Sequence, residues 1–235
     1  PNIQPSGINS AKLDTLLERY AKALRKNPED IIETDWENEM DSTLNIMIGI
    51  PPKSFTYDNK KYTPLSLAKN LGLNQDDYIQ LTSFNHHPYY DKFCLESRFN
   101  WSYSLYYNVP LDEFISTIDS ALSKGYSVAL NTDVSGSEFE TGFLRGYIIN
   151  NKTEKITQDI RQKAFETGYT TVDHIMHIIG MAIDEKNQKF YIVKNSWGSF
   201  YRDGYLYLSE SYIREMGVSI LVNKSGLPAT LKSRF

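Results

Sequence analysis

The sequence is poor in cysteine and has no excess of basic residues. Its 235 residues include one cysteine, Cys94, which cannot form a disulfide within the chain, so a fold stabilised by internal disulfides is excluded. The 25 Lys and Arg residues are outnumbered by 29 Asp and Glu residues, which gives a net charge of −4. This balance provides no electrostatic attraction for a polyanion and argues against nucleic-acid binding.

Long apolar runs are also missing. The longest apolar segments, such as residues 178–183, have the length of a strand, so the sequence predicts no membrane partner. The first residues, Pro-Asn-Ile-Gln-Pro-Ser-Gly, have neither the basic start nor the apolar stretch of a signal peptide. They also lack an initiator Met, and we therefore expect that a further segment precedes Pro1 in the gene product.

The sequence does contain enough apolar side chains for a packed core, because hydrophobic residues make up 40% of the chain. Apolar residues recur at helical spacing in three segments, residues 10–24, 36–48 and 111–124. After Gly125, strand-like segments dominate. We therefore predict an α+β fold in one structural unit, with a mainly helical portion over residues 1–125 and a β-rich portion over residues 126–235.

Two strand-like segments in the second half carry the most specific signal. Residues 176–183 and 190–194 are separated by the polar loop Asp-Glu-Lys-Asn-Gln, which indicates a hairpin. His174 precedes the first segment, and Asn195 follows the second in the string Lys-Asn-Ser-Trp-Gly. The two residues are 21 positions apart, so we expect the hairpin to bring the imidazole and the carboxamide together.

An imidazole and a carboxamide in this arrangement suit catalysis by a thiol nucleophile. A neighbouring imidazolium stabilises the thiolate and thereby lowers the pKa of the thiol. An amide oxygen that accepts from the second ring nitrogen holds the imidazole in position without adding a charge. We therefore predict that His174 and Asn195 are catalytic and that Trp197 shields their hydrogen bond from water.

Each motif alone has an ordinary structural explanation. A single His on a strand is more often packed or exposed than catalytic, and Asn-Ser-Trp-Gly can form a turn. The order and spacing of the two motifs together favour the catalytic interpretation. His177 lies three residues after His174 and would face the opposite side of a strand, so we interpret it as structural. Asp173 should likewise point away from His174.

Much of the chain resembles the papain-like cysteine peptidases, and among them the bleomycin hydrolase and aminopeptidase C subfamily. Besides the His and Asn strings, the resemblance rests on residues 51–57, 62–65, 131–134, 168 and 204–206. It implies a papain-like fold in which a helical half and an antiparallel, barrel-like β-rich half enclose a cleft. It further implies a cysteine-type aminopeptidase that acts on peptide substrates, forms a homo-oligomer and needs no metal or organic cofactor.

The nucleophile of this family is not recognisable in the sequence. In the family, the cysteine begins a long helix and follows an oxyanion-hole Gln, whereas Cys94 lies in Asp-Lys-Phe-Cys-Leu-Glu and Gln80 stands in a different context. We therefore expect the chain to be the C-terminal portion of a longer peptidase, inactive alone, with the catalytic Cys in the missing N-terminal segment. The alternative is a papain-like scaffold that lost its nucleophile and binds peptides or a protein partner.

The resemblance leaves the mode of cleavage and the compartment open. Aminopeptidases of the family have a C-terminal arm whose end lies in the cleft, but the chain ends at Phe235, soon after its last predicted strand. Endopeptidase-like or dipeptide-releasing activity therefore stays open beside aminopeptidase action. The resemblance implies a cytoplasmic protein, whereas a signal in the missing segment would indicate a periplasmic or secreted one.

Adjacent His86 and His87 raise the question of a metal site. Paired imidazoles can bind zinc, but these two have no Cys, His or carboxylate at the usual zinc-ligand spacing. We therefore predict a solvated loop around them and no metal.

Overall fold

A computed structural model of the chain describes residues 10–26, 35–97, 99–150, 155–196 and 202–235. Its internal contacts divide the chain into two compact units, Pro1–Asn74 and Gln75–Phe235. No helix among the described residues is long and apolar enough to cross a membrane. Trp197, which the sequence suggests as a shield of the site, lies outside the described residues.

The described part of the first unit consists of helices and one small hairpin. Its elements are α1 (Ser10–Lys26), α3 (Trp36–Ile48), β1 (Phe55–Tyr57), β2 (Lys60–Tyr62) and α4 (Pro64–Asn70). The first two helices confirm the helical spacing seen in the sequence. Thr63 caps α4 by accepting a hydrogen bond from the Ser66 N–H, and Pro64 occupies the first helical position, where no donor is needed. None of residues 12–26 and 35–74 of this unit is buried.

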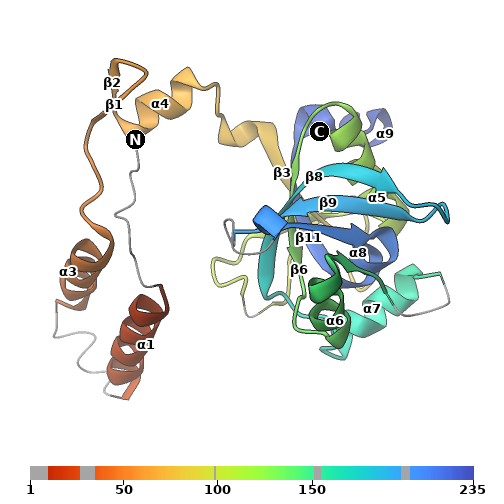
Figure 1. Cartoon of the computed structure of the whole chain (residues 1–235), viewed down its shortest axis with the longest axis horizontal. Helices are drawn as coiled ribbons and strands as arrows, with labels where there is room; N and C mark the ends of the chain where they lie inside the picture. Colours follow the sequence, from red (N-terminus) through yellow and green to blue (C-terminus); the bar gives the residue numbers. More distant parts are fainter. Residues whose placement is uncertain (1–9, 27–34, 98, 151–154, 197–201) are drawn as a thin grey trace. The chain divides into compact units, whose positions relative to one another are not determined.

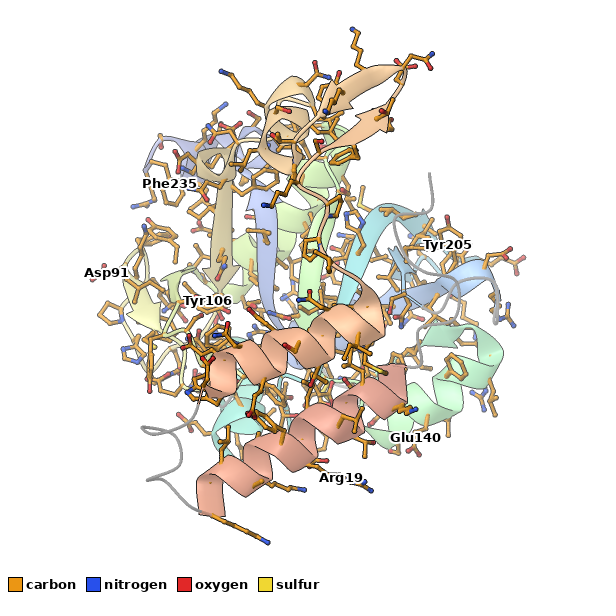
Figure 2. All side chains as sticks on the ribbon, turned by 90° about the vertical axis from the view of Figure 1, so that its left-hand side faces the viewer. Arg19, Asp91, Tyr106, Glu140, Tyr205 and Phe235 are labelled. Atoms are coloured by element: carbon orange, nitrogen blue, oxygen red, sulfur yellow. The ribbon has the colours of Figure 1, made fainter. Side chains whose placement is uncertain are left out.

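The second unit is built on a nine-stranded sheet among the described residues (Figure 1). In sheet order its strands are β4 (Lys92–Cys94), β5 (Leu105–Asn108), β3 (Tyr78–Thr82), β11 (Gly217–Asn223), β6 (Val128–Thr132), β8 (His174–Ile183), β9 (Lys189–Lys194), β10 (Tyr205–Ser209) and β7 (Tyr147–Ile148). Neighbouring strands are antiparallel except in the pairs β3–β5 and β7–β10. Figure 2 shows Tyr106 of β5 and Tyr205 of β10 well apart, as expected for strands near opposite edges of the sheet.

Helices pack on this sheet and close its core. They are α5 (Leu111–Ser123), α6 (Ser137–Arg145), α7 (Gln158–Glu166), α8 (Glu210–Met216) and α9 (Ala229–Lys232), with single 3₁₀ turns at Gln75–Asp77, Arg202–Gly204 and Lys224–Gly226. The buried residues of α5 include Phe114, Ile118 and Ala121, whose spacing places them on one face of the helix. They pack in one cluster with buried residues of β6, β8 and β9, so the strands that carry the predicted site are anchored in the core.

The boundary between the units differs from the one expected from the sequence. The sequence predicts a helical portion that ends at residue 125, but the contacts divide the chain between Asn74 and Gln75. The difference arises because β3, β4 and β5, which all lie before residue 125, join the same sheet as the later strands. These strands have five, three and four residues, too few for their alternation to be distinguished from that of irregular chain.

Close packing between α8 and β6 depends on Gly217, the first residue of β11. A Cβ atom at this position would lie 2.6 Å from the backbone oxygen of Ile213 in α8 and 3.2 Å from the Leu130 Cδ1 atom in β6. The backbone φ of Gly217 is −76°, so the glycine is needed for space and not for an unusual backbone conformation. This contact matters for the site because Gly217 pairs with Thr132, the last residue of β6.

We predict that Gly217→Ala lowers the free energy of unfolding by about 1–3 kcal/mol, because the added methyl group overpacks the α8–β6 contact. The matched control is Gly136→Ala, which has the same φ of −76° and whose Cβ would meet flexible side-chain ends, no nearer than 3.3 Å. We expect the control to change stability by less than about 1 kcal/mol. Urea unfolding followed by circular dichroism measures both values, and equal effects would contradict the packing argument.

Candidate active site

A β-bulge in the hairpin of β8 and β9 decides which side of the sheet Asn195 faces. Near the turn, Gly180 pairs with Ile192. Toward the open end, Ile178 pairs with Val193, so the register shifts by one residue between the two positions. Side chains alternate between the faces of a strand, and a shift of one residue therefore moves every later side chain of β9 to the other face relative to β8.

Continuing the shifted register places Asn195 opposite Met176 and one diagonal step from His174. Met176 is buried, and its face of β8 is also that of His174. Without the shift, Asn195 would lie opposite His177, whose side chain is exposed. The bulge thus brings the carboxamide to the face that carries the His174 imidazole.

The predicted contact between the two side chains is present. The His174 Nε2 atom lies 3.0 Å from the Asn195 Oδ1 atom, with His174 half-buried and Asn195 only 3% exposed. The same Oδ1 atom accepts from the Ser196 N–H at 2.7 Å, which fixes the oxygen of the amide on this side. His174 Nε2 therefore acts as the donor to Asn195. The Asn195 Nδ2 atom is buried and has no hydrogen-bond partner among the described residues.

The sequence profile of the Peptidase C1-like family matches residues 6–235. The chain belongs to this family. The match confirms the resemblance to papain-like cysteine peptidases that the His and Asn strings indicate.

Curated relatives of the chain are named aminopeptidases. Aminopeptidase G of Lactobacillus delbrueckii subsp. lactis is 27% identical over 90% of this chain and 52% of the relative. Aminopeptidase E of Lactobacillus helveticus is 28% identical over 92% of this chain and 54% of the relative. The chain therefore spans about half the length of these relatives.

A solved structure of similar fold is that of PepW from Lactobacillus rhamnosis HN001. It covers 99% of this chain and 60% of its own chain, with a TM-score of 0.69 at 21% sequence identity. This similarity confirms the predicted α+β, papain-like fold.

His177 and Asp173, the neighbours of His174 whose side chains the sequence predicts to point away from it, make contacts elsewhere. His177 faces the opposite side of β8, where its Nε2 atom lies 2.7 Å from the Ser127 Oγ atom. The Asp173 Oδ1 atom accepts a hydrogen bond from the Val134 N–H at 2.9 Å. Both contacts agree with the prediction that these side chains point away from the His174 imidazole.

The cysteine of this family member lies far from the His174–Asn195 pair. Cys94 is on β4, an edge strand of the sheet, and four other strands lie between β4 and β8 in the strand order. Its half-buried Sγ atom lies 3.5 Å from the Asn100 Nδ2 atom. A thiol must approach the imidazole within hydrogen-bond distance to exchange a proton, so the position of Cys94 is unsuited to a nucleophile.

A cavity of about 160 Å³ lies beside the start of β8. Its lining includes Ile175, Asn131 and Ser219 from three adjacent strands, together with Gln80 from β3. The Asn131 Nδ2 atom donates to the Ser219 Oγ atom at 3.1 Å, whereas the buried Gln80 Oε1 atom has no partner among the described residues. The sequence did not single out Asn131 or Ser219 as site residues, because single polar residues within strands carry no pattern.

Among the described residues, one group of three potential metal ligands has its ligand atoms within 4.8 Å of one another, namely His86, His87 and Glu96. Glu96 is the member that sequence spacing did not reveal. Its carboxylate lies between the imidazoles, with His86 Nε2 at 3.0 Å and His87 Nε2 at 2.6 Å. Burial raises the pKa of Glu96, but the bonds from His87 and His86 outweigh it and leave the pKa below its ordinary value.

The hydrogen bonds of Gln162 assign the proton on His86. Gln162 Oε1 accepts from the Asn85 N–H at 2.7 Å, and Gln162 Nε2 donates to Glu166 at 2.8 Å. The amide NH₂ group therefore faces His86 Nδ1, at 2.9 Å, and this nitrogen must accept. The ring proton of neutral His86 is then on Nε2, where it is donated to Glu96. A metal ligand requires an unprotonated nitrogen, so this arrangement favours a hydrogen-bonded loop over a metal site.

We predict that Zn²⁺ titrated into the chain shows no stoichiometric binding that depends on this cluster, because His86 Nε2 carries a proton. Isothermal titration calorimetry on the unaltered chain, His87→Ala and Glu96→Gln should give the same weak heats. The matched control is His177→Ala, which removes a His outside the cluster. One-to-one binding that His87→Ala abolishes and His177→Ala preserves would contradict the proton assignment.

Proposed function

We propose that this chain is the His- and Asn-bearing portion of a cysteine aminopeptidase whose nucleophile lies outside residues 1–235. The observation that carries the proposal is the 3.0 Å contact between His174 Nε2 and Asn195 Oδ1 on neighbouring strands. Membership of the Peptidase C1-like family and the aminopeptidase names of the curated relatives support it. Peptides are the proposed substrates.

The orientation of His174 suggests how the complete enzyme would move protons. Because Nε2 faces Asn195, proton exchange with the thiol would use Nδ1. The thiol would pass its proton to Nδ1, and the thiolate would attack the carbonyl carbon of the scissile peptide bond. The protonated imidazole would then protonate the leaving amine. Asn195 would hold the ring in place through both steps without itself taking up a proton.

Loss of the imidazole should remove most activity of the complete enzyme. We predict that His174→Ala in the product of the complete gene lowers kcat/KM for an aminoacyl fluorogenic substrate by about four orders of magnitude or more, because the thiolate and its proton carrier act as a unit. The matched control is His177→Ala, which removes an imidazole from the other face of the same strand and should keep kcat/KM within about threefold. Similar losses in both variants would argue against the assigned role of His174.

The location of the nucleophile can be tested by labelling. We predict that the chain of 235 residues alone shows no peptidase turnover and that a thiol-directed epoxide inhibitor does not label it. The same inhibitor should label the product of the complete gene at a cysteine other than Cys94, so that Cys94→Ser preserves the label. Labelling of Cys94 that requires His174 would place the nucleophile within this chain. An intact complete product with a further cysteine that resists labelling would favour a non-catalytic scaffold.

A further inference from the structure

Asp133 is a buried carboxylate whose oxygens are bound by uncharged donors from two separate loops. Asp133 directly follows Thr132, the last residue of β6, and it is 1% exposed. Oδ1 accepts from the N–H of Ser135 at 2.8 Å and from its Oγ hydroxyl at 2.7 Å. Oδ2 accepts from the N–H of Thr171 at 2.6 Å and from its Oγ1 hydroxyl at 2.9 Å. A buried charge is costly unless it is hydrogen-bonded, and these four bonds meet that requirement.

The backbone of Asp133 is held as well, by α8. Its N–H donates to the Met216 oxygen at 3.1 Å, and its own oxygen accepts from the Tyr212 hydroxyl at 2.6 Å. Burial, and after it the Asp133 carboxylate, raise the pKa of Tyr212, so this hydroxyl remains a donor at neutral pH. The backbone of Asp133 is thus fixed to α8 independently of the bonds between its side chain and Thr171.

Thr171 lies three residues before His174, at the point where the chain approaches β8. The β6–β8 ladder ends with the pair Thr132 and His174, and beyond it one backbone bond remains, from the Asp173 N–H to the Thr132 oxygen at 3.4 Å. Three bonds to carboxylates strengthen the connection: Asp133 accepts from the N–H and the hydroxyl of Thr171, and Asp173 accepts from the Val134 N–H. The backbone leading to His174 is therefore fixed by carboxylates after the ladder has ended.

We propose that Asp133 is a positioning residue for His174: its carboxylate fixes the segment before β8 so that the imidazole meets Asn195. The functional meaning of this inference rests on the proposed role of His174, but the positioning itself can be measured without turnover. Asp133 acts through the backbone, since its four side-chain bonds go to Ser135 and Thr171.

The substitution Asp133→Asn tests this role at nearly constant side-chain volume. A carboxylate accepts with both oxygens, whereas an amide presents an NH₂ group at one end. Whichever way the amide turns, its NH₂ group faces a backbone N–H that cannot accept, either that of Thr171 or that of Ser135. One of the two loops therefore loses the hydrogen bond from its backbone N–H to the side chain at position 133.

The readout is the ring of His174 in the chain labelled with ¹⁵N-histidine, assigned by comparison with His174→Ala. In the unaltered chain we expect the Nε2-protonated tautomer with a slowly exchanging ring proton. In Asp133→Asn we expect that proton to exchange at least about tenfold faster. Loss of hydrogen bonds to a charged acceptor changes by that factor or more the equilibrium between the conformation in which His174 meets Asn195 and conformations in which the ring proton is open to solvent. Asn195→Ala should give the same direction of change, since it removes the acceptor itself.

The matched control is Asp119→Asn on α5, which weakens bonds to the Tyr191 hydroxyl and to Lys189 at the far end of β9. We expect this control to lower the melting temperature but to leave exchange of the His174 proton within about twofold. If Asp133→Asn does not fold, Thr171→Val removes only the hydroxyl donor and must still accelerate exchange. Unchanged exchange in the folded variant, or equal acceleration in Asp119→Asn, would overturn the proposal.

Discussion

The candidate site depends on a one-residue shift in register between β8 and β9. β8 pairs without interruption with β6, from Val128 opposite Ile178 to Thr132 opposite His174. The bulge is in β8, between Ile178 and Gly180, and it changes the register of the β8–β9 ladder. The position of His174 is consequently set by β6, and the shift acts only on Asn195. One extra residue in β8 therefore converts a carboxamide on the exposed face into one buried beside the imidazole.

Separate parts of the core hold the two members of this pair. Asn195 continues the pairing of β9 with β10, because its N–H donates to the Gly204 oxygen at 2.8 Å. His174 is held by β6 and by the loop after Thr132, which α8 supports through Tyr212 and Met216. The 3.0 Å contact between the side chains then joins two positions that are each already fixed. A hydrogen bond between preorganised groups costs little conformational entropy, and this geometry is therefore well defined.

The sequence predicted the elements with strong local patterns and missed those that depend on pairing. The helices α1, α3 and α5 and the hairpin of β8 and β9 have enough residues for their periodicity to be visible. The strings around His174 and Asn195 indicated the site because the chemistry fixes residue type and spacing together. The only local signal of the bulge is Gly180, because a glycine inside a strand often marks one, but the glycine alone does not give the resulting register of β9. Asp133 and Glu96 were missed for a related reason, as their partners Thr171 and His87 are brought near by the fold.

Orientation of the His174 imidazole and activation of a thiol are two separate requirements of the proposed mechanism. Among the described residues, the hydrogen bond that orients the His174 imidazole comes from Asn195 of the second unit, which contributes a neutral acceptor. A thiol, by contrast, gains its low pKa only when an imidazolium stabilises the thiolate at close range. In the proposed enzyme, reactivity would therefore require both the geometry of the His174–Asn195 pair and a cysteine within hydrogen-bond distance of the imidazole. The carboxylate of Asp133 would serve the first of these requirements, because its bonds to Thr171 fix the segment that leads into β8.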